Sequence, residues 1–147
     1  MPQSLAFPAA VPIAPAGDEL LEDLEPPASA HAVVIGHHRL DVLCALIRKG
    51  CAGVTELRPH DQGGPRPEPA QIAILVDPAS LGEAASLIAL AWRALDGGGR
   101  LVVQDPGGHR YQIEGLLRAQ GFIAIFSRET ARGTLLLGRR PFALAHG

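Results

Sequence analysis

The stretch Ile72–Val103, IAILVDPASLGEAASLIALAWRALDGGGRLVV, predicts a strand, a helix and a second strand in immediate succession. Its first five residues are apolar without alternation, which is typical of a strand buried on both faces of a sheet. Ser80 and Glu83 then form a capping box, in which the serine hydroxyl accepts the amide N–H three residues later. Apolar residues at helical spacing follow as far as Leu95, and Gly97–Gly99 are expected to end the helix. A strand, a helix and a strand in this order predict parallel pairing through a right-handed crossover.

The same alternation continues on both sides of this stretch. The strands expected in all are Ala32–Ile35, Gly53–Leu57, Ile72–Val76, Arg100–Gln104, Phe122–Ser127 and Thr134–Gly138. The helices expected are His38–Lys49, Leu81–Leu95 and Arg110–Gln120. The short connection between the last two strands predicts an antiparallel hairpin at one end of the sheet. The sequence therefore predicts an α/β fold, with a mostly parallel sheet of about six strands, a terminal antiparallel hairpin, and helices on both faces.

Length and composition indicate one folded domain with a flexible end. The chain has 147 residues, of which 47% are apolar, and this is enough to build one hydrophobic core. Residues 1–16 are rich in proline and alanine and are expected to form a flexible arm, followed by a single domain over residues 17–147. A short acidic helix is expected at Gly17–Glu25, and a long irregular loop at Arg58–Gln71.

Charge and composition argue against several classes of protein. The net charge is −2, and the aromatic residues are only four Phe, one Tyr and one Trp, so nucleic-acid binding is not expected. No apolar run approaches the roughly 18–20 residues that cross a membrane. No basic residue precedes Arg39, so a signal peptide is not expected either. We therefore expect a cytoplasmic protein in which Cys44 and Cys51 are reduced thiols. Arginine supplies twelve of the thirteen basic residues, which suggests a GC-rich bacterial genome.

The second half of the chain also carries a family resemblance. An acid, Asp77, follows a strand, and a glycine turn, Gly97–Gly99, precedes a strand of the RLVV type, Arg100–Val103. A GF pair, Gly121-Phe122, follows the last helix, and a final hairpin ends with Thr134–Pro141. In this order and spacing, residues Ile72–Pro141 resemble the C-terminal half of class I S-adenosylmethionine-dependent methyltransferases. The resemblance implies a Rossmann-like methyltransferase fold and S-adenosylmethionine as the cofactor.

The first strand–helix turn departs from the family's pattern. The family has D/E-x-G-x-G-x-G at this turn, because glycine lets the cofactor lie against the backbone. This chain keeps only Gly36. Val34 occupies the place of the acid, and His37 and His38 follow the glycine. We therefore expect S-adenosylmethionine to bind weakly or not at all.

A second feature of the family survives at the end of the second strand. Glu56 lies twenty residues after Gly36, in the place of the acid that takes the ribose hydroxyls. The resemblance implies a cofactor site at Gly36, His37, His38, Glu56, Leu57 and Asp77, and it assigns no catalytic residue. The loop 58–71 replaces the family's third strand, which leaves Gly53–Leu57 at a sheet edge. We expect the loop, the N-terminal arm or a second subunit to cover that edge.

Other uses of the strand ends remain open at the level of the sequence. Strand ends in such a fold are polar where they meet solvent, and this alone accounts for residues such as His60-Asp61 and Asp105–His109. An anion bound at the helix start beside His37 and Arg39 is a second use. A metal ion is not expected, since the histidines match no ligand spacing. A nicotinamide dehydrogenase needs the G-x-G-x-x-G motif, which a single glycine does not supply.

Two functions follow from the resemblance. The first is a non-catalytic relative with a degenerate cofactor loop, which acts through binding or assembly, with a protein partner or as a homo-oligomer. The second is an active S-adenosylmethionine-dependent methyltransferase with an atypical cofactor site, which acts on a small molecule. The short chain favours the first function, because little sequence remains for a segment that recognises a substrate.

Overall fold

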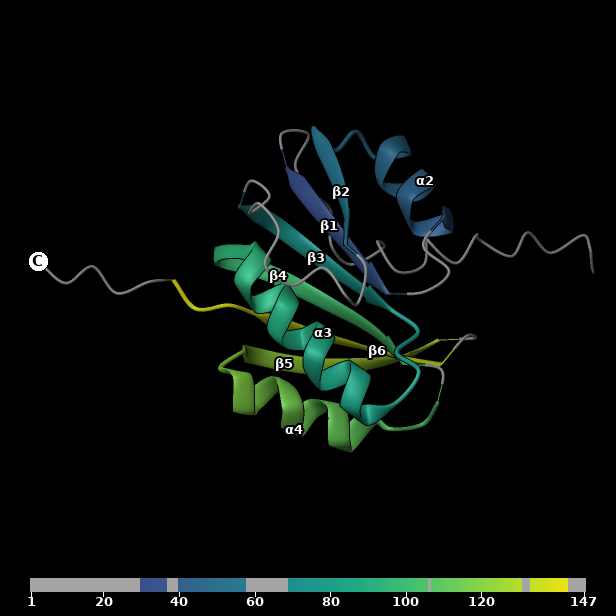
Figure 1. The fold of residues 1–147 in the computed structure, drawn as a ribbon, viewed down its shortest axis with the longest axis vertical. Coiled ribbons are helices and arrows are strands. Elements are labelled where there is room, and N and C mark those ends of the chain that lie inside the picture. The colour runs from purple at the N-terminus through teal and green to yellow at the C-terminus, as the bar shows by residue number, and fades with distance from the viewer. Residues whose placement is uncertain (1–29, 37–39, 58–68, 106, 131–132, 143–147) are drawn as a thin grey trace, which may run out of the picture.

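The computed structural model describes residues 30–36, 40–57, 69–105, 107–130 and 133–142 (Figure 1). Its elements are β1 (His31–Gly36), α2 (Leu40–Arg48), β2 (Gly53–Leu57), β3 (Ala70–Val76), α3 (Leu81–Ala94), β4 (Leu95–Asp105), α4 (Arg110–Gln120), β5 (Ile123–Thr130) and β6 (Gly133–Arg139). The predicted arm at residues 1–16, the predicted helix Gly17–Glu25 and most of the predicted loop Arg58–Gln71 lie outside the described residues. The other predicted strands and helices are present, with ends shifted by a few residues.

A single six-stranded sheet, in the order β2-β1-β3-β4-β6-β5, forms the centre of the fold. Strand β1 pairs in parallel with β2 and β3, and β3 pairs in parallel with β4. Strand β6 lies between β4 and β5 and is antiparallel to both. The predicted architecture, a mostly parallel sheet with a terminal antiparallel hairpin, is therefore confirmed.

Helices cover both faces of the sheet, as predicted. Figure 1 shows α3 in front of the strands and α4 next to β5, and side chains of both helices share a core layer with Val33 and Ile35 of β1. Val34 packs in the opposite layer, together with side chains of α2. All three β1 side chains are at most 1% exposed, which explains why this strand reads as a continuous apolar run. Among the described residues, no helix is both long and apolar enough to span a membrane.

The start of α3 is the capping box that the sequence predicts. The hydroxyl of Ser80 accepts the backbone N–H of Glu83 at 3.1 Å. The carboxylate of Glu83 reaches back and accepts the backbone N–H of Ala79 at 3.0 Å. The helix then buries one face through Ala84, Leu87, Ile88, Leu90, Ala91 and Ala94. Two amides at the helix N-terminus are thus satisfied by side chains before the apolar face begins.

The prediction that Gly97–Gly99 end this helix is wrong. Helix α3 ends at Ala94, and the three glycines belong to β4. Leu95 pairs with Ala70 and the next pair joins Arg100 to Ile72, so residues 96–99 bulge out of the ladder. Gly98 has a φ of +81°, and its N–H donates to the carbonyl of Arg140 at 2.8 Å. The glycines therefore shape a bulge that meets the end of β6, a partner more than forty residues away.

We expect Ser80→Ala to lower the free energy of unfolding by about 1 kcal/mol, because the N–H of Glu83 loses its acceptor. Chemical denaturation of the purified chain measures this loss. The control is Ser86→Ala, since the Ser86 hydroxyl donates only to the Gly82 carbonyl within the helix, at 3.3 Å. That change is expected to stay within about 0.5 kcal/mol. Equal losses for the two serines would contradict the capping role.

Candidate functional site

The carboxyl ends of β1, β2 and β3 bring together three of the predicted cofactor residues. Gly36 is the last residue of β1 and pairs in register with Val76, so Asp77 follows one position beyond it. Leu57 ends β2 beside Ile35, the residue before Gly36. In open α/β sheets, ligands bind in the crevice outside this edge. His37, His38, Arg39 and His60-Asp61, which were also predicted here, lie outside the described residues.

The backbone of Glu56 lies farther inside the sheet than the ends of its neighbours. Glu56 pairs in register with Val34, two residues before Gly36. At a rise of about 3.3 Å per residue, its Cα lies roughly 7 Å below the level of Gly36. The Glu56 side chain is exposed on the outermost strand of the sheet. A contact from its carboxylate to a ligand over Gly36 thus requires the full length of the side chain.

The glycine at position 36 is required by the sheet itself. Gly36 has a φ of +120°, a conformation that residues with a side chain rarely adopt. A Cβ built on it would overlap the backbone carbonyl of Val76 on the neighbouring strand. Close packing of β1 against β3 therefore accounts for this glycine without any ligand.

Val34 is buried in the apolar layer beside α2, where the family has its acid. Its side chain is 0% exposed and packs in a cluster that includes Val42, Leu46 and Ile74. The side chain of a valine donates and accepts no hydrogen bond. The contact that the family's acid supplies has no equivalent at this position.

Asp77 is the residue of this edge that packing explains least. It is half-buried and has a φ of +50°, which is unusual for a residue other than glycine. Its carboxylate has no hydrogen bond or ion pair within the described part of the chain. Backbone strain of this kind costs on the order of 1–3 kcal/mol and clusters at functional sites. Asp77 therefore stays a candidate for ligand binding on its own geometry.

Asp105, on the neighbouring strand β4, has a structural task. Val76 pairs with Gln104, so Asp105 lies level with Asp77. Asp105 is 2% exposed. Its carboxylate accepts the backbone N–H of Gly107 at 3.0 Å and that of His109 at 2.7 Å. The imidazole Nδ1 of His109 lies 4.0 Å from one oxygen of the same carboxylate. The buried carboxylate thus anchors the turn that leads into α4.

Within the described ranges, no group of three or more His, Cys, Asp or Glu side chains could hold a metal ion. Both cysteines are free thiols, as predicted, with Cys44 exposed and Cys51 half-buried. Burial raises the pKa of the Cys51 thiol, which lowers its reactivity at neutral pH.

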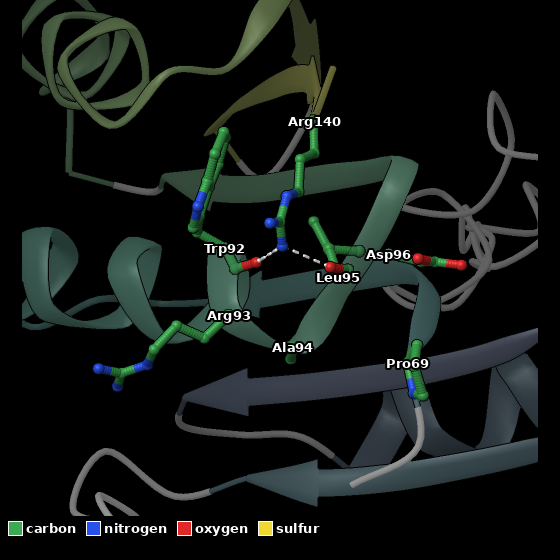
Figure 2. Close-up of a pocket in the computed structure, with 7 residues that line it drawn as sticks. All are labelled: Pro69, Trp92, Arg93, Ala94, Leu95, Asp96 and Arg140. Carbon is green, nitrogen blue, oxygen red and sulfur yellow. Dashed lines mark hydrogen bonds between the residues drawn. The ribbon is translucent and has the colours of Figure 1, made fainter. Parts of the chain in front are cut away.

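A pocket of about 310 Å³ lies at the opposite end of the sheet (Figure 2). It is lined by Pro69, Trp92, Arg93, Ala94, Leu95, Asp96 and Arg140. These residues come from the C-terminus of α3, the start of β4 and the segment after β6, except Pro69, which directly precedes β3. Sequence reasoning missed this pocket, because Arg140 joins residues 92–96 only through the antiparallel placement of β6.

The strand order, with an antiparallel β6 between β4 and β5, defines the class I S-adenosylmethionine-dependent methyltransferase fold, and comparison with solved structures confirms it. The methyltransferase SibL in its apo form matches with a TM-score of 0.65 at 13% identity, over 86% of this chain and 55% of that one. A methyltransferase from Pyrococcus furiosus matches with a TM-score of 0.65 at 13% identity, over 84% of this chain and 81% of that one.

The [4+2]-cyclase SpnF matches with a TM-score of 0.64 at 13% identity, over 86% of this chain and 80% of that one. The chain thus spans only about half the length of SibL. No family model and no curated protein matches the sequence. At these identities the likeness concerns the fold.

Proposed function

We propose that this chain is a methyltransferase-fold protein with a degenerate S-adenosylmethionine loop, which acts through binding or assembly rather than methyl transfer. The observation that carries the proposal is the fully buried Val34 in the place of the family's acid. Two further observations support it. The single glycine, Gly36, is accounted for by its contact with β3, and the backbone of Glu56 lies two residues below the edge.

The sheet edge at β2 supports an assembly role. β2 is the outermost strand of the described sheet, and its Thr55 and Glu56 are exposed. An edge strand offers backbone N–H and C=O groups that pair with another strand. A protein partner or a second copy of the chain is the occupant that we propose for this edge.

An active methyltransferase with an atypical cofactor site is the second candidate, and Asp77 favours it. A half-buried carboxylate with a positive φ, one position beyond Gly36, is an arrangement that strained functional residues adopt. In this function, the carboxyl edge would hold S-adenosylmethionine and a small-molecule substrate. The match to SpnF, described as a [4+2]-cyclase, shows that the fold alone does not specify methyl transfer.

Calorimetric titration with S-adenosylmethionine and S-adenosylhomocysteine separates the two candidates. We expect dissociation constants near or above about 1 mM, because losing two or three polar contacts weakens a micromolar ligand by several powers of ten. Glu56→Ala is expected to change this weak binding little. A dissociation constant below about 10 μM that Glu56→Ala abolishes would contradict the degenerate loop and favour the second candidate. Thr55→Ala, an exposed change on the same strand, is the control for loss of fold.

A further inference from the structure

The pocket at the amino ends of the parallel strands is built around the guanidinium of Arg140. Its Nη1 atom donates to the carbonyl oxygens of Trp92 and Leu95, the latter at 2.6 Å (Figure 2). These carbonyls belong to the last turn and cap of α3, where a helix leaves its C=O groups without intrahelical partners. A cation at this end also complements the helix dipole. Arg140 therefore caps the C-terminus of α3, the helix that forms one wall of the pocket.

Aromatic packing fixes the same guanidinium in a second direction. Its central carbon lies 4.6 Å from the centroid of the Trp92 ring. The Trp92 ring in turn packs edge-on against Phe122, with centroids 5.1 Å apart. Two hydrogen bonds and one cation–π contact thus hold Arg140 in place before any ligand arrives, which reduces the entropy lost on binding.

Three hydrogen-bond donors of the pocket are unused within the described residues. Within the described residues, Nε and Nη2 of Arg140 and the indole N–H of Trp92 have no acceptor. The carboxylate of Asp96 accepts the N–H of Gly97 at 3.0 Å, and Figure 2 shows it turned away from Arg140. Arg93 adds a second positive charge at the rim, although its side chain also extends away from Arg140 in Figure 2. Unused donors and a net positive lining favour an anionic ligand.

From this geometry we propose that the pocket binds the carboxylate of a small molecule, through a bidentate pair with Nε and Nη2 of Arg140. The planar guanidinium fork matches the two oxygens of a carboxylate, whereas a lysine offers only a point charge. A volume of about 310 Å³ suits a small molecule. The site lies at the opposite end of the strands from Gly36 and Asp77, so it is independent of the proposed cofactor crevice.

The experiment uses Trp92, the only tryptophan in the chain, as the reporter. Its fluorescence is followed during titration with sodium acetate and sodium benzoate, and with sodium chloride at equal ionic strength as the reference. We expect saturable changes with the carboxylates, half complete near about 10 mM, and no saturation with chloride. In ¹⁵N-labelled wild-type protein, the indole and Arg140 Nε resonances should shift along the same curve.

Two variants assign the effect to the guanidinium. Arg140→Lys keeps the charge but removes the fork, and we expect at least about tenfold weaker carboxylate binding. Arg139→Gln removes an exposed neighbouring charge on β6 and should leave binding unchanged. Circular dichroism verifies that both variants are folded, and the resonance shifts of the wild type test the proposal even if Arg140→Lys unfolds.

Three outcomes would overturn the proposal. The first is a response to chloride that equals the response to acetate. The second is unchanged affinity in folded Arg140→Lys. The third comes from a parallel titration with inorganic phosphate, in which saturation by phosphate without saturation by either carboxylate would assign the pocket to tetrahedral anions.

Discussion

Replacing Gly36 by alanine is expected to lower the free energy of unfolding by more than about 3 kcal/mol, which is a large effect for a single methyl group. A left-handed backbone costs a residue with a side chain about 1–2 kcal/mol, and Gly36 has a φ of +120°. The new Cβ would also overlap the carbonyl of Val76, a backbone atom that moves only if β1 and β3 separate. Urea denaturation followed by circular dichroism measures the loss.

The matched control is Gly50→Ala. Gly50 also has a positive φ, +82°, but a Cβ there would meet no atom within 4 Å. Gly50→Ala is therefore expected to lower the free energy of unfolding through backbone strain alone, by about 1–2 kcal/mol. Equal losses at the two glycines would show that the space between β1 and β3 is not limiting. The positive φ of Gly36 would then be the only structural reason for this glycine.

The fold was predictable because its signals are local or periodic. Buried strands without alternation, the capping box at Ser80 and a terminal glycine such as Gly121 each act over a few residues. Gly121 shows this directly, since its φ is +115° and its N–H bonds the carbonyl of Arg118 at 3.1 Å, as a helix C-cap requires. Tertiary context reinforced these elements and did not override them.

The glycines Gly97–Gly99 show where such reasoning fails. A glycine run after an apolar helix normally indicates a helix end. Here the backbone of Gly98 and Gly99 instead bonds with that of Arg140, and the helix end is closed by the Arg140 side chain. Neither interaction can be predicted from the local sequence, because both depend on the placement of β6 beside β4.

For the candidate site, the sequence predicts which residues lie close together but not their detailed geometry. Parallel strands place their carboxyl ends at one edge, so the proximity of Gly36, Leu57 and Asp77 follows from the strand order. The depth of Glu56 depends on strand register, which a sequence without alternation specifies weakly. The positive φ of Asp77 likewise has no local signal, because aspartate is tolerated in many turns.

Asp77, which follows β3, and Asp105, which ends β4, should differ sharply when replaced. Asp105→Ala is expected to cost about 3 kcal/mol, because the amides of Gly107 and His109 both lose a charged acceptor. Asp105→Asn keeps one acceptor oxygen and should cost roughly half as much. The first amides of α4 should exchange with solvent faster in both variants, as hydrogen exchange would detect.

Asp77→Ala should instead lower the free energy of unfolding by no more than about 1 kcal/mol, because no hydrogen bond is lost within the described residues and the backbone keeps its positive φ. Asp96→Ala is the reference for an exposed aspartate, since its carboxylate accepts only the N–H of Gly97. A loss at Asp77 as large as that at Asp105 would show that Asp77 also anchors its turn. Its strained backbone would then serve the fold, and the strongest argument for an active cofactor site at this edge would disappear.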